Sequence, residues 1–329
     1  MEFWLEMIDR EWKRKSKIAR IMQVQMHNAA SAGEEVVIPF LTFPQLEQTS
    51  IIKHLFTTKL GGVSQGQFAS LNLSYTRGDD KACVDENYRR VAKALGCAVE
   101  DIVCSDQTHT ANVRRVTQAD RGKGVVFPRD YTDVDGLITN EQGIALATFY
   151  ADCVPLYMVD TVNKAIGLSH SGWRGTVQRI GAVTLQEMAK AYGTNPCDVK
   201  VAIGPSICQE CYEVSEDVAL EFIRAFEQTE RYVEEFSKRG INVVSDSFLE
   251  SDQATASSLG EATLCYRKPN GKYQLNLWFA NYMVFREAGV PDEQIEITDI
   301  CTCCNSELLF SHRASHGRRG NLGAFLMLK

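Results

Sequence analysis

The sequence contains no apolar run long enough to cross a bilayer. Its longest apolar stretch, residues 144–159, is short and is interrupted by Asp152, whereas a transmembrane helix needs about 20 apolar residues. Residues 1–17 mix acidic and basic side chains with apolar ones, so they lack the continuous apolar segment of a secretory signal peptide. We therefore expect a cytoplasmic protein without a membrane partner.

The sequence also lacks an excess of positive charge. Its 35 lysines and arginines are outnumbered by 42 aspartates and glutamates, which gives a net charge of −7. Surfaces that bind nucleic acid depend on clustered basic side chains, so we expect no nucleic acid among the partners. A small anionic substrate remains compatible, because a few arginines in a pocket are enough to bind it.

The chain is long enough, at 329 residues, for one large domain or two ordinary ones. Residues 1–35 are rich in charge and end in a run of small residues at 28–33, which predicts a helical or disordered N-terminal extension. Globular patterning begins near Val36, without an internal repeat or a long linker after it. We therefore expect a single catalytic domain over residues 36–329.

Strand and helix patterns alternate irregularly along this domain. Apolar residues from Val84 to Leu95 fall on one helical face, and Gly96 ends that helix. The patterns predict further helices over 175–192, from the N-cap Ser215 to 227, and over 275–288, and strands over 102–104, 113–116, 136–139, 144–150, 154–159, 165–169, 199–203, 295–300 and 322–328. Several strands follow each other directly, which favours an α+β sandwich over a strictly alternating parallel sheet.

Histidine is scarce, with only six in the chain, and two of them lie in settings that suit chemistry. His109 follows a short strand in a polar turn, and His170 ends an apolar strand. Cys153 follows Asp152 inside an apolar run, where a buried carboxylate needs a partner. Two imidazoles and a thiolate form a three-ligand set that leaves a fourth position of zinc open. Ordinary core and turn roles for these residues remain open, because no local metal motif joins them.

A series of motifs along the chain carries a family resemblance. In chain order they are Gly61-Gly62-Val63-Ser64, Leu71-Asn72-Leu73, Ala151-Asp152-Cys153-Val154-Pro155, His170-Ser171-Gly172-Trp173-Arg174-Gly175, Ile203-Gly204-Pro205-Ser206-Ile207, Tyr212-Glu213-Val214 and Cys301-Thr302. Together they resemble the laccase-domain family, also called multicopper polyphenol oxidase-like proteins. The resemblance extends from about His54 to the C-terminus.

The resemblance implies a fold, an activity and a cofactor. The implied fold is a mixed β-sandwich flanked by helices, shared with certain toxin-type cysteine hydrolases. The implied activity is that of a purine nucleoside phosphorylase acting on adenosine, inosine and methylthioadenosine, with adenosine deaminase activity. It implies a zinc ion held by His109, Cys153 and His170, with copper as another candidate metal.

Phosphorolysis requires inorganic phosphate as well as the nucleoside, and arginine binds phosphate by planar, bidentate hydrogen bonds. Arg313 is our first candidate for this role. Lys59 is the second, and it stands where the family usually has arginine. Asn72 and Gln107 are candidates for hydrogen bonds to the sugar or base, although each could instead cap the backbone. Arg174 could bind the anion or form a structural salt bridge.

The 11 cysteines raise the question of a second metal site. Cys208 and Cys211 form one closely spaced pair, and Cys301, Cys303 and Cys304 form another group. Two such groups can hold a structural zinc ion. The alternative is that they are reduced thiols in the core or in turns.

Other functions remain open at this point. A copper-dependent polyphenol oxidase would need a second, imidazole-rich copper cluster, for which six histidines are too few. A metal-independent cysteine hydrolase would use Cys153 as nucleophile and His170 as base. The usual zinc deaminase signature is absent, and a non-catalytic binding protein is the alternative to an enzyme.

Overall fold

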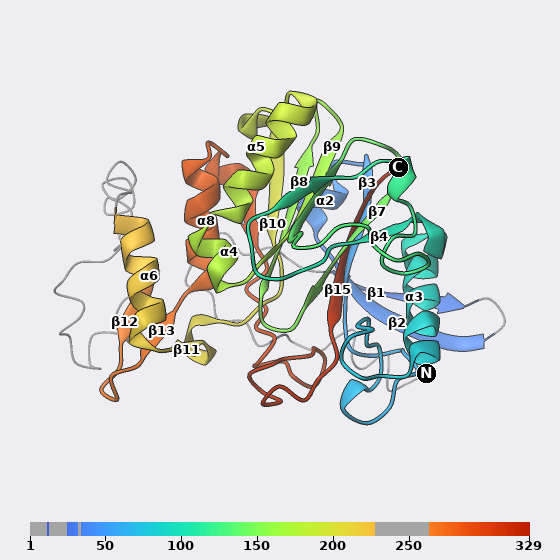
Figure 1. Cartoon of the computed structure of the whole chain (residues 1–329), viewed down its shortest axis with the longest axis horizontal. Coiled ribbons are helices and arrows are strands. Elements are labelled where there is room, and N and C mark those ends of the chain that lie inside the picture. Colours follow the sequence, from blue (N-terminus) through green and yellow to red (C-terminus); the bar gives the residue numbers. More distant parts are fainter. Residues whose placement is uncertain (1–11, 13–24, 32–33, 228–262) are drawn as a thin grey trace.

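The computed structural model describes residue 12 and residues 25–31, 34–227 and 263–329. Two six-stranded sheets form its centre (Figure 1). In spatial order, the first sheet consists of β1 (Gln25–Ser31), β2 (Glu34–Thr42), β3 (Ile52–Thr57), β15 (Leu322–Leu328), β7 (Ala145–Tyr150) and β4 (Ile102–Cys104). The second consists of β14 (Ile295–Ile297), β10 (Val199–Ile203), β8 (Val154–Asp160), β9 (Ala165–Ser171), β6 (Gly136–Thr139) and β5 (Val113–Arg115).

A third, small sheet and a set of helices complete the described part of the chain. The small sheet has the order β11 (Glu213–Val214), β13 (Tyr273–Leu275) and β12 (Cys265–Arg267). The α-helices are α2 (Pro44–Glu47), α3 (Lys81–Leu95), α4 (Trp173–Val177), α5 (Ile180–Tyr192), α6 (Glu216–Glu227) and α8 (Leu277–Glu287). Short 3-10 turns are η1 (Gly66–Phe68), η2 (Val99–Asp101), η3 (Gln118–Asp120), η4 (Pro196–Asp198), η5 (Gln209–Cys211) and η7 (Asp292–Gln294).

The elements stack in layers, with α3 on one side of the paired sheets and α4, α5 and α8 on the other (Figure 1). Alternation along each strand produces this arrangement, because successive side chains point to opposite faces. In β8, Leu156 and Met158 pack toward the helices, whereas Tyr157 and Val159 pack between the sheets. In β7, Ala145 and Ala147 pack with α3, whereas Leu146 faces the second sheet.

Several predicted elements are confirmed with small changes of boundary. The helix after Asp80 covers Lys81–Leu95, and Gly96 ends it at a φ of 72°. The strands predicted over 102–104, 136–139, 199–203 and 322–328 have the predicted bounds. The strand predicted over 295–300 ends earlier, at Ile297.

Two predicted helices differ from the structure for identifiable reasons. The helix expected over 175–192 is broken into α4 and α5, because Arg179 has a φ of 61° and a left-handed residue cannot continue a right-handed helix. The helix expected to begin at residue 275 begins at Leu277. Its N-cap is Asn276, whose side chain accepts a hydrogen bond from Phe279 N at 3.0 Å.

The N-terminal prediction is wrong where the structure can be compared with it. Residues 25–31 form strand β1, which pairs with β2 in antiparallel register, so this part of the expected extension is neither helical nor disordered. The predicted boundary at residue 35 falls inside β2. Residues 1–11, 13–24 and 32–33 of the predicted extension lie outside the described residues.

The chain changes sheets between β7 and β8, and this crossover determines where Cys153 lies. The intervening Asp152 has a φ of 88°, which turns the backbone sharply. Strands β6 and β7, which are joined by a short turn, likewise lie in different sheets. Among the described helices, none has the length and apolar character needed to span a membrane.

Candidate metal centre

His109 lies in a turn after β4 that is held by one buried carboxylate. Its φ is 67°, a conformation that few non-glycine residues adopt, and its side chain is exposed. Three consecutive backbone N–H groups, those of residues 108–110, donate to the carboxylate of Asp135 at 3.0, 3.1 and 2.9 Å. Asp135 therefore stabilises the unusual turn that presents the His109 imidazole.

The same carboxylate orients His170 at the end of β9. The Nδ1 of His170 lies 2.8 Å from Asp135 Oδ1, and its backbone N–H donates to Asp135 O at 2.8 Å. Asp135 is fully buried, and the His170 side chain is only 4% exposed. With Nδ1 held in this way, Nε2 is the ring nitrogen left to bind a metal.

The protonation states of this pair follow from their contacts. Burial by itself lowers the pKa of His170, but the charges and hydrogen bonds of Cys153 and Asp135 outweigh it and raise the pKa to about 9. Burial raises the pKa of Asp135, yet its contacts with His170 and with the N–H groups of Thr110 and Thr108 hold it below its usual value. Asp135 is therefore a carboxylate in this site.

Cys153 occupies the start of β8, directly after the crossover, and is partly buried. Its Sγ lies 4.0 Å from His109 Nε2. Burial raises the pKa of the thiol, but the charge of His170 and the hydrogen bonds to His109 and His170 reverse this and lower it to about 6. A thiolate is the form in which cysteine binds metals or attacks electrophiles.

The geometry of these three residues fits a metal ion. One ligand atom from each of His109, Cys153 and His170 lies within 4.8 Å of the other two, and the two imidazole centroids are 5.0 Å apart. In a tetrahedral zinc site with Zn–N and Zn–S bonds of about 2.0–2.3 Å, ligand atoms lie roughly 3.4–3.7 Å apart. Small side-chain movements would therefore complete the site.

Gly172 is the residue that leaves room for this convergence. A Cβ at this position would lie 2.7 Å from His109 Cδ2 and 3.3 Å from Cys153 Sγ. The φ of Gly172 is −75°, which any residue can adopt, so the requirement for glycine is steric.

Asp152, which the sequence suggested must have a partner, has two. Its Oδ1 accepts from Thr302 Oγ1 at 2.7 Å and its Oδ2 accepts from the backbone N of Arg313 at 2.7 Å. The guanidinium of Arg313 donates to the carbonyls of Cys211 and Glu213 at 3.0 and 2.9 Å. These contacts make Arg313 a brace for the wall of the site, which weakens its candidacy as the phosphate ligand.

The other predicted substrate residues are also engaged within the protein. Asn72 Nδ2 donates to Asp79 and to the Ser74 carbonyl, and its Oδ1 accepts from the backbone of Ser74 and Asn321. Gln107 forms two hydrogen bonds with the backbone of Phe149, at 2.7 and 2.6 Å. For both residues the observed contacts favour the backbone-capping role.

Lys59 is half-buried, and its Nζ donates to the carbonyl of Ser306 at 2.7 Å. Burial lowers the pKa of its ammonium group, and the charge of Glu307 opposes that effect. The contact ties the loop after β3 to the segment before Leu308, and no contact with the three candidate metal ligands is seen among the described residues.

Two other arginines are candidates for binding an anion: Arg174, for which the sequence left this role open, and Arg319. Arg174 is exposed, stacks over Trp173 at 4.3 Å, and forms no ion pair with any carboxylate in the described part of the chain. Arg319 is partly buried, and burial together with the charge of Arg77 lowers its pKa to about 10, while the charge of Cys153 raises it. Its Nη1 donates to the Gly320 carbonyl at 3.2 Å and to Asn321 Oδ1, and its Nε is buried without a hydrogen-bond partner among the described residues. One donor of the Arg319 guanidinium is therefore unused.

Asp135 is the functional residue that sequence reasoning missed. A weak signal existed, because Asp133-Val134-Asp135 places two acidic residues directly before a strand. A metal-binding histidine commonly uses its second nitrogen on a carboxylate, so an acidic partner for His170 was to be expected. Its identity could not be chosen among 42 acidic residues without the fold.

Known proteins share this architecture over most of the chain. A family described as multi-copper polyphenol oxidoreductase laccase matches residues 53–329. Purine nucleoside phosphorylase YlmD of Bacillus subtilis is 34% identical over 278 residues, which cover 83% of this chain and 87% of that protein. Adenosine deaminase RL5, from an unknown prokaryotic organism, is 31% identical over 260 residues, which cover 78% of this chain and 87% of that protein.

The similarity extends to three dimensions. The crystal structure of YlmD from Geobacillus stearothermophilus matches with a TM-score of 0.73 at 32% identity, and the match covers 94% of this chain and 99% of that one. The mixed α+β sandwich flanked by helices, expected from the sequence, is therefore confirmed.

Proposed function

This chain belongs to the multi-copper polyphenol oxidoreductase laccase family, and we propose that it is a zinc-dependent purine nucleoside phosphorylase with adenosine deaminase activity. Its proposed substrates are adenosine, inosine and methylthioadenosine, together with inorganic phosphate. The convergence of His109, Cys153 and His170 on one point carries the proposal. The names of the relatives YlmD and RL5 support the two activities.

The three ligands would hold zinc through two imidazole nitrogens and one thiolate, leaving a fourth position open. When bound, zinc supplies Lewis acidity that suits both activation of water near neutral pH and polarisation of a nucleoside. Asp135 keeps the His170 ring in its orientation and, through its contacts with residues 108–110, keeps His109 facing Cys153. One buried carboxylate therefore positions both histidines.

Phosphate binding is assigned to arginines close to the metal ligands. We propose Arg319 in place of Arg313 as the first candidate. Both Nη atoms of Arg313 donate to carbonyls, whereas in Arg319 Nη1 donates to Gly320 O and Asn321 Oδ1 and Nε lacks a partner among the described residues. Arg174 is the second candidate. Both would bind the phosphate oxyanions by charge-assisted hydrogen bonds and would orient the nucleophile toward the ribose.

A cysteine hydrolase is the alternative that one observation favours. Cys153 contacts His170, and His170 contacts Asp135. A nucleophile, a base and a carboxylate that orients the base are the general arrangement of a catalytic triad. Such an enzyme would work without metal and would lose activity on thiol alkylation. The zinc-dependent proposal instead requires loss of activity on chelation and recovery with added zinc.

A copper-dependent polyphenol oxidase is less well supported by the chain itself. The set of His109, Cys153 and His170 could bind copper, but such an oxidase needs further imidazoles around a second copper cluster. His54 is buried and accepts a hydrogen bond from Phe43 N at 2.8 Å. The six histidines of the chain are too few for that chemistry.

The decisive experiment is a product assay on the purified full-length chain with inosine. We expect hypoxanthine and ribose 1-phosphate only when phosphate is present, and inosine from adenosine in a separate assay. His170→Ala should abolish both reactions, whereas His316→Ala, which alters an exposed histidine, should leave both intact. Equal cleavage without phosphate, or full activity of His170→Ala, would show that the proposal is wrong.

A further inference from the structure

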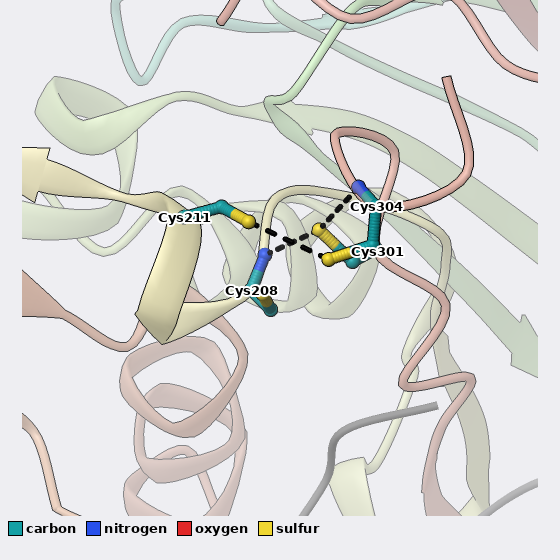
Figure 2. Close-up of side chains that lie close together, drawn as sticks. All are labelled: Cys208, Cys211, Cys301 and Cys304. Carbon is teal, nitrogen blue, oxygen red and sulfur yellow. Dashed lines mark hydrogen bonds between the residues drawn. The ribbon is translucent and has the colours of Figure 1, made fainter. Parts of the chain in front are cut away.

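Four cysteine sulfurs gather in a second place, outside the candidate metal centre. The Sγ atoms of Cys208, Cys211, Cys301 and Cys304 all lie within 4.8 Å of one another (Figure 2). In a tetrahedral site with Zn–S bonds of about 2.3 Å, sulfurs are separated by roughly 3.8 Å. The observed cluster therefore differs from such a site by less than the movement that side-chain rotation allows.

Local backbone structure presents the sulfurs in two pairs. Cys208 directly precedes the 3-10 turn η5, and Cys211 is the last residue of that turn. The N–H groups of Cys211 and Tyr212 donate to the Cys208 carbonyl at 3.2 and 3.0 Å. Cys301 and Cys304 lie in a turn closed by Asn305 N, which donates to the Cys301 carbonyl at 3.0 Å. Each pair has two intervening residues, the spacing found in structural zinc sites.

The two turns are joined although 93 residues separate Cys208 from Cys301 in the chain. A parallel bridge pairs Ser206 with Cys301, so both turns start from a fixed register. Cys301 Sγ then accepts backbone N–H groups from Cys208 at 3.2 Å and from Cys304 at 3.4 Å, and Cys211 Sγ lies 3.5 Å from Cys304 Sγ (Figure 2). N–H donors directed at a sulfur stabilise its thiolate form.

The burial of the cluster also suits a metal ion. Cys208 and Cys301 are 1% and 0% exposed, whereas Cys211 and Cys304 are partly exposed. The outer pair therefore leaves a route by which an ion can enter. A buried thiol that only fills space needs no sulfur neighbours, and Cys265 in the same apolar core is an example that lies outside the cluster.

We propose that Cys208, Cys211, Cys301 and Cys304 bind a structural zinc ion. Four thiolates are a donor set that zinc prefers, and they leave no open position for water or substrate. The ion would fasten the segment at 206–212 to the segment at 301–305. Because Thr302 and Arg313 from this region contact Asp152, the site would also stabilise the wall next to Cys153.

The first test counts zinc in the purified full-length chain by elemental mass spectrometry. To separate the two sites, the His109→Ala/His170→Ala double variant removes two ligands of the candidate metal centre. We expect this variant to retain one zinc per chain. Adding Cys208→Ser and Cys211→Ser should remove that zinc, whereas the matched control Cys303→Ser, which alters the thiol beside Cys304, should retain it.

A second measurement needs no substitution, and so does not depend on variants that fold. Zinc-loaded and chelator-treated wild-type chains are treated with an alkylating reagent, and each labelled cysteine is identified by peptide mass spectrometry. We expect chelation to accelerate alkylation of Cys211 and Cys304 by at least tenfold, with the exposed Cys197 unchanged as the internal control. Equal alkylation rates with and without zinc, a disulfide between Cys211 and Cys304, or iron in place of zinc would each overturn the proposal.

Discussion

Asp135 Oδ1 lies 2.8 Å from His170 Nδ1, and the same oxygen accepts the backbone N–H of His109 at 3.1 Å. One fully buried carboxylate therefore contacts both histidines of the candidate metal centre, although these lie on different elements of the fold. The contact joins strand β9 to the turn after β4. It makes metal affinity and local folding depend on the same side chain.

Replacing this carboxylate by an amide should weaken metal binding. Asp135→Asn keeps the size of the side chain but removes its charge, and loss of such an outer contact typically lowers metal affinity by about 10–100-fold. Zinc affinity is measured by competition with a chromophoric chelator, with urea unfolding as a check on the fold. The control is Asp133→Asn in the same loop, which contacts Thr108 Oγ1 at 2.8 Å and should leave affinity unchanged; an unaltered affinity in Asp135→Asn would contradict this role.

The missing side chain at Gly172 gives an independent test of how closely the three candidate ligands approach one another. Gly172→Ala would place a Cβ 2.7 Å from the His109 ring, and overpacking of this kind costs about 1–3 kcal/mol. Because the backbone φ is −75°, the fold should persist while zinc affinity falls. Gly143→Ala, where a Cβ meets nothing within 4 Å but φ is 74°, should lower stability without changing zinc affinity. A wild-type affinity in Gly172→Ala would show that the three ligands do not need to approach this closely.

The affinity for zinc should rise with pH over a defined range. In the metal-free protein the pKa of His170 is raised to about 9 and that of Cys153 is lowered to about 6. Between these values zinc must displace the proton on His170 while Cys153 is already a thiolate, so affinity should rise about tenfold per pH unit. Below the Cys153 pKa both ligands are protonated and the slope should double.

The Asp135→Asn variant is the control for this dependence of zinc affinity on pH. In Asp135→Asn the carboxylate that raises the His170 pKa is absent, so the plateau of affinity should begin at a lower pH than in the wild type. Isothermal calorimetry in buffers of different ionisation enthalpy counts the protons released. A zinc affinity that is independent of pH between the two pKa values would refute the assignment of His170 as a ligand.

Arg319, the first candidate phosphate ligand, and Arg313, which it replaces, should respond differently to substitution. Arg319→Ala should raise the KM for phosphate by about 10–100-fold, since a lost hydrogen bond to a charged group costs about 1.5–3 kcal/mol, with little change in the KM for inosine. Arg313→Ala should mainly lower the melting temperature, because its guanidinium braces the carbonyls of Cys211 and Glu213. Steady-state kinetics and thermal unfolding on both variants decide the matter, and the reverse pattern would restore Arg313 as the anion ligand.

The sequence by itself determined the local elements whose periodicity is long or whose ends are marked. The helix Lys81–Leu95 has an apolar face of regular spacing and a terminal glycine, and strand Leu322–Leu328 is a continuous apolar run. The motifs around Cys153 and His170 indicated the family because many short patterns occurred in order. Their residue types and settings made His109, Cys153 and His170 candidates, and the family resemblance implied that they are the metal ligands.

Only the tertiary structure decided which distant residues meet. Asp135 reaches His109 and His170 across 26 and 35 residues, and the paired cysteines meet across 93, separations over which sequence spacing gives no distance. Asn72 and Gln107 offer the same amide to a substrate or to a backbone, and only the fold shows that loop and strand atoms occupy those hydrogen bonds. Strands β6 and β7 follow one another through a short turn yet lie in different sheets, because sheet membership depends on hydrogen-bond partners that local sequence does not specify.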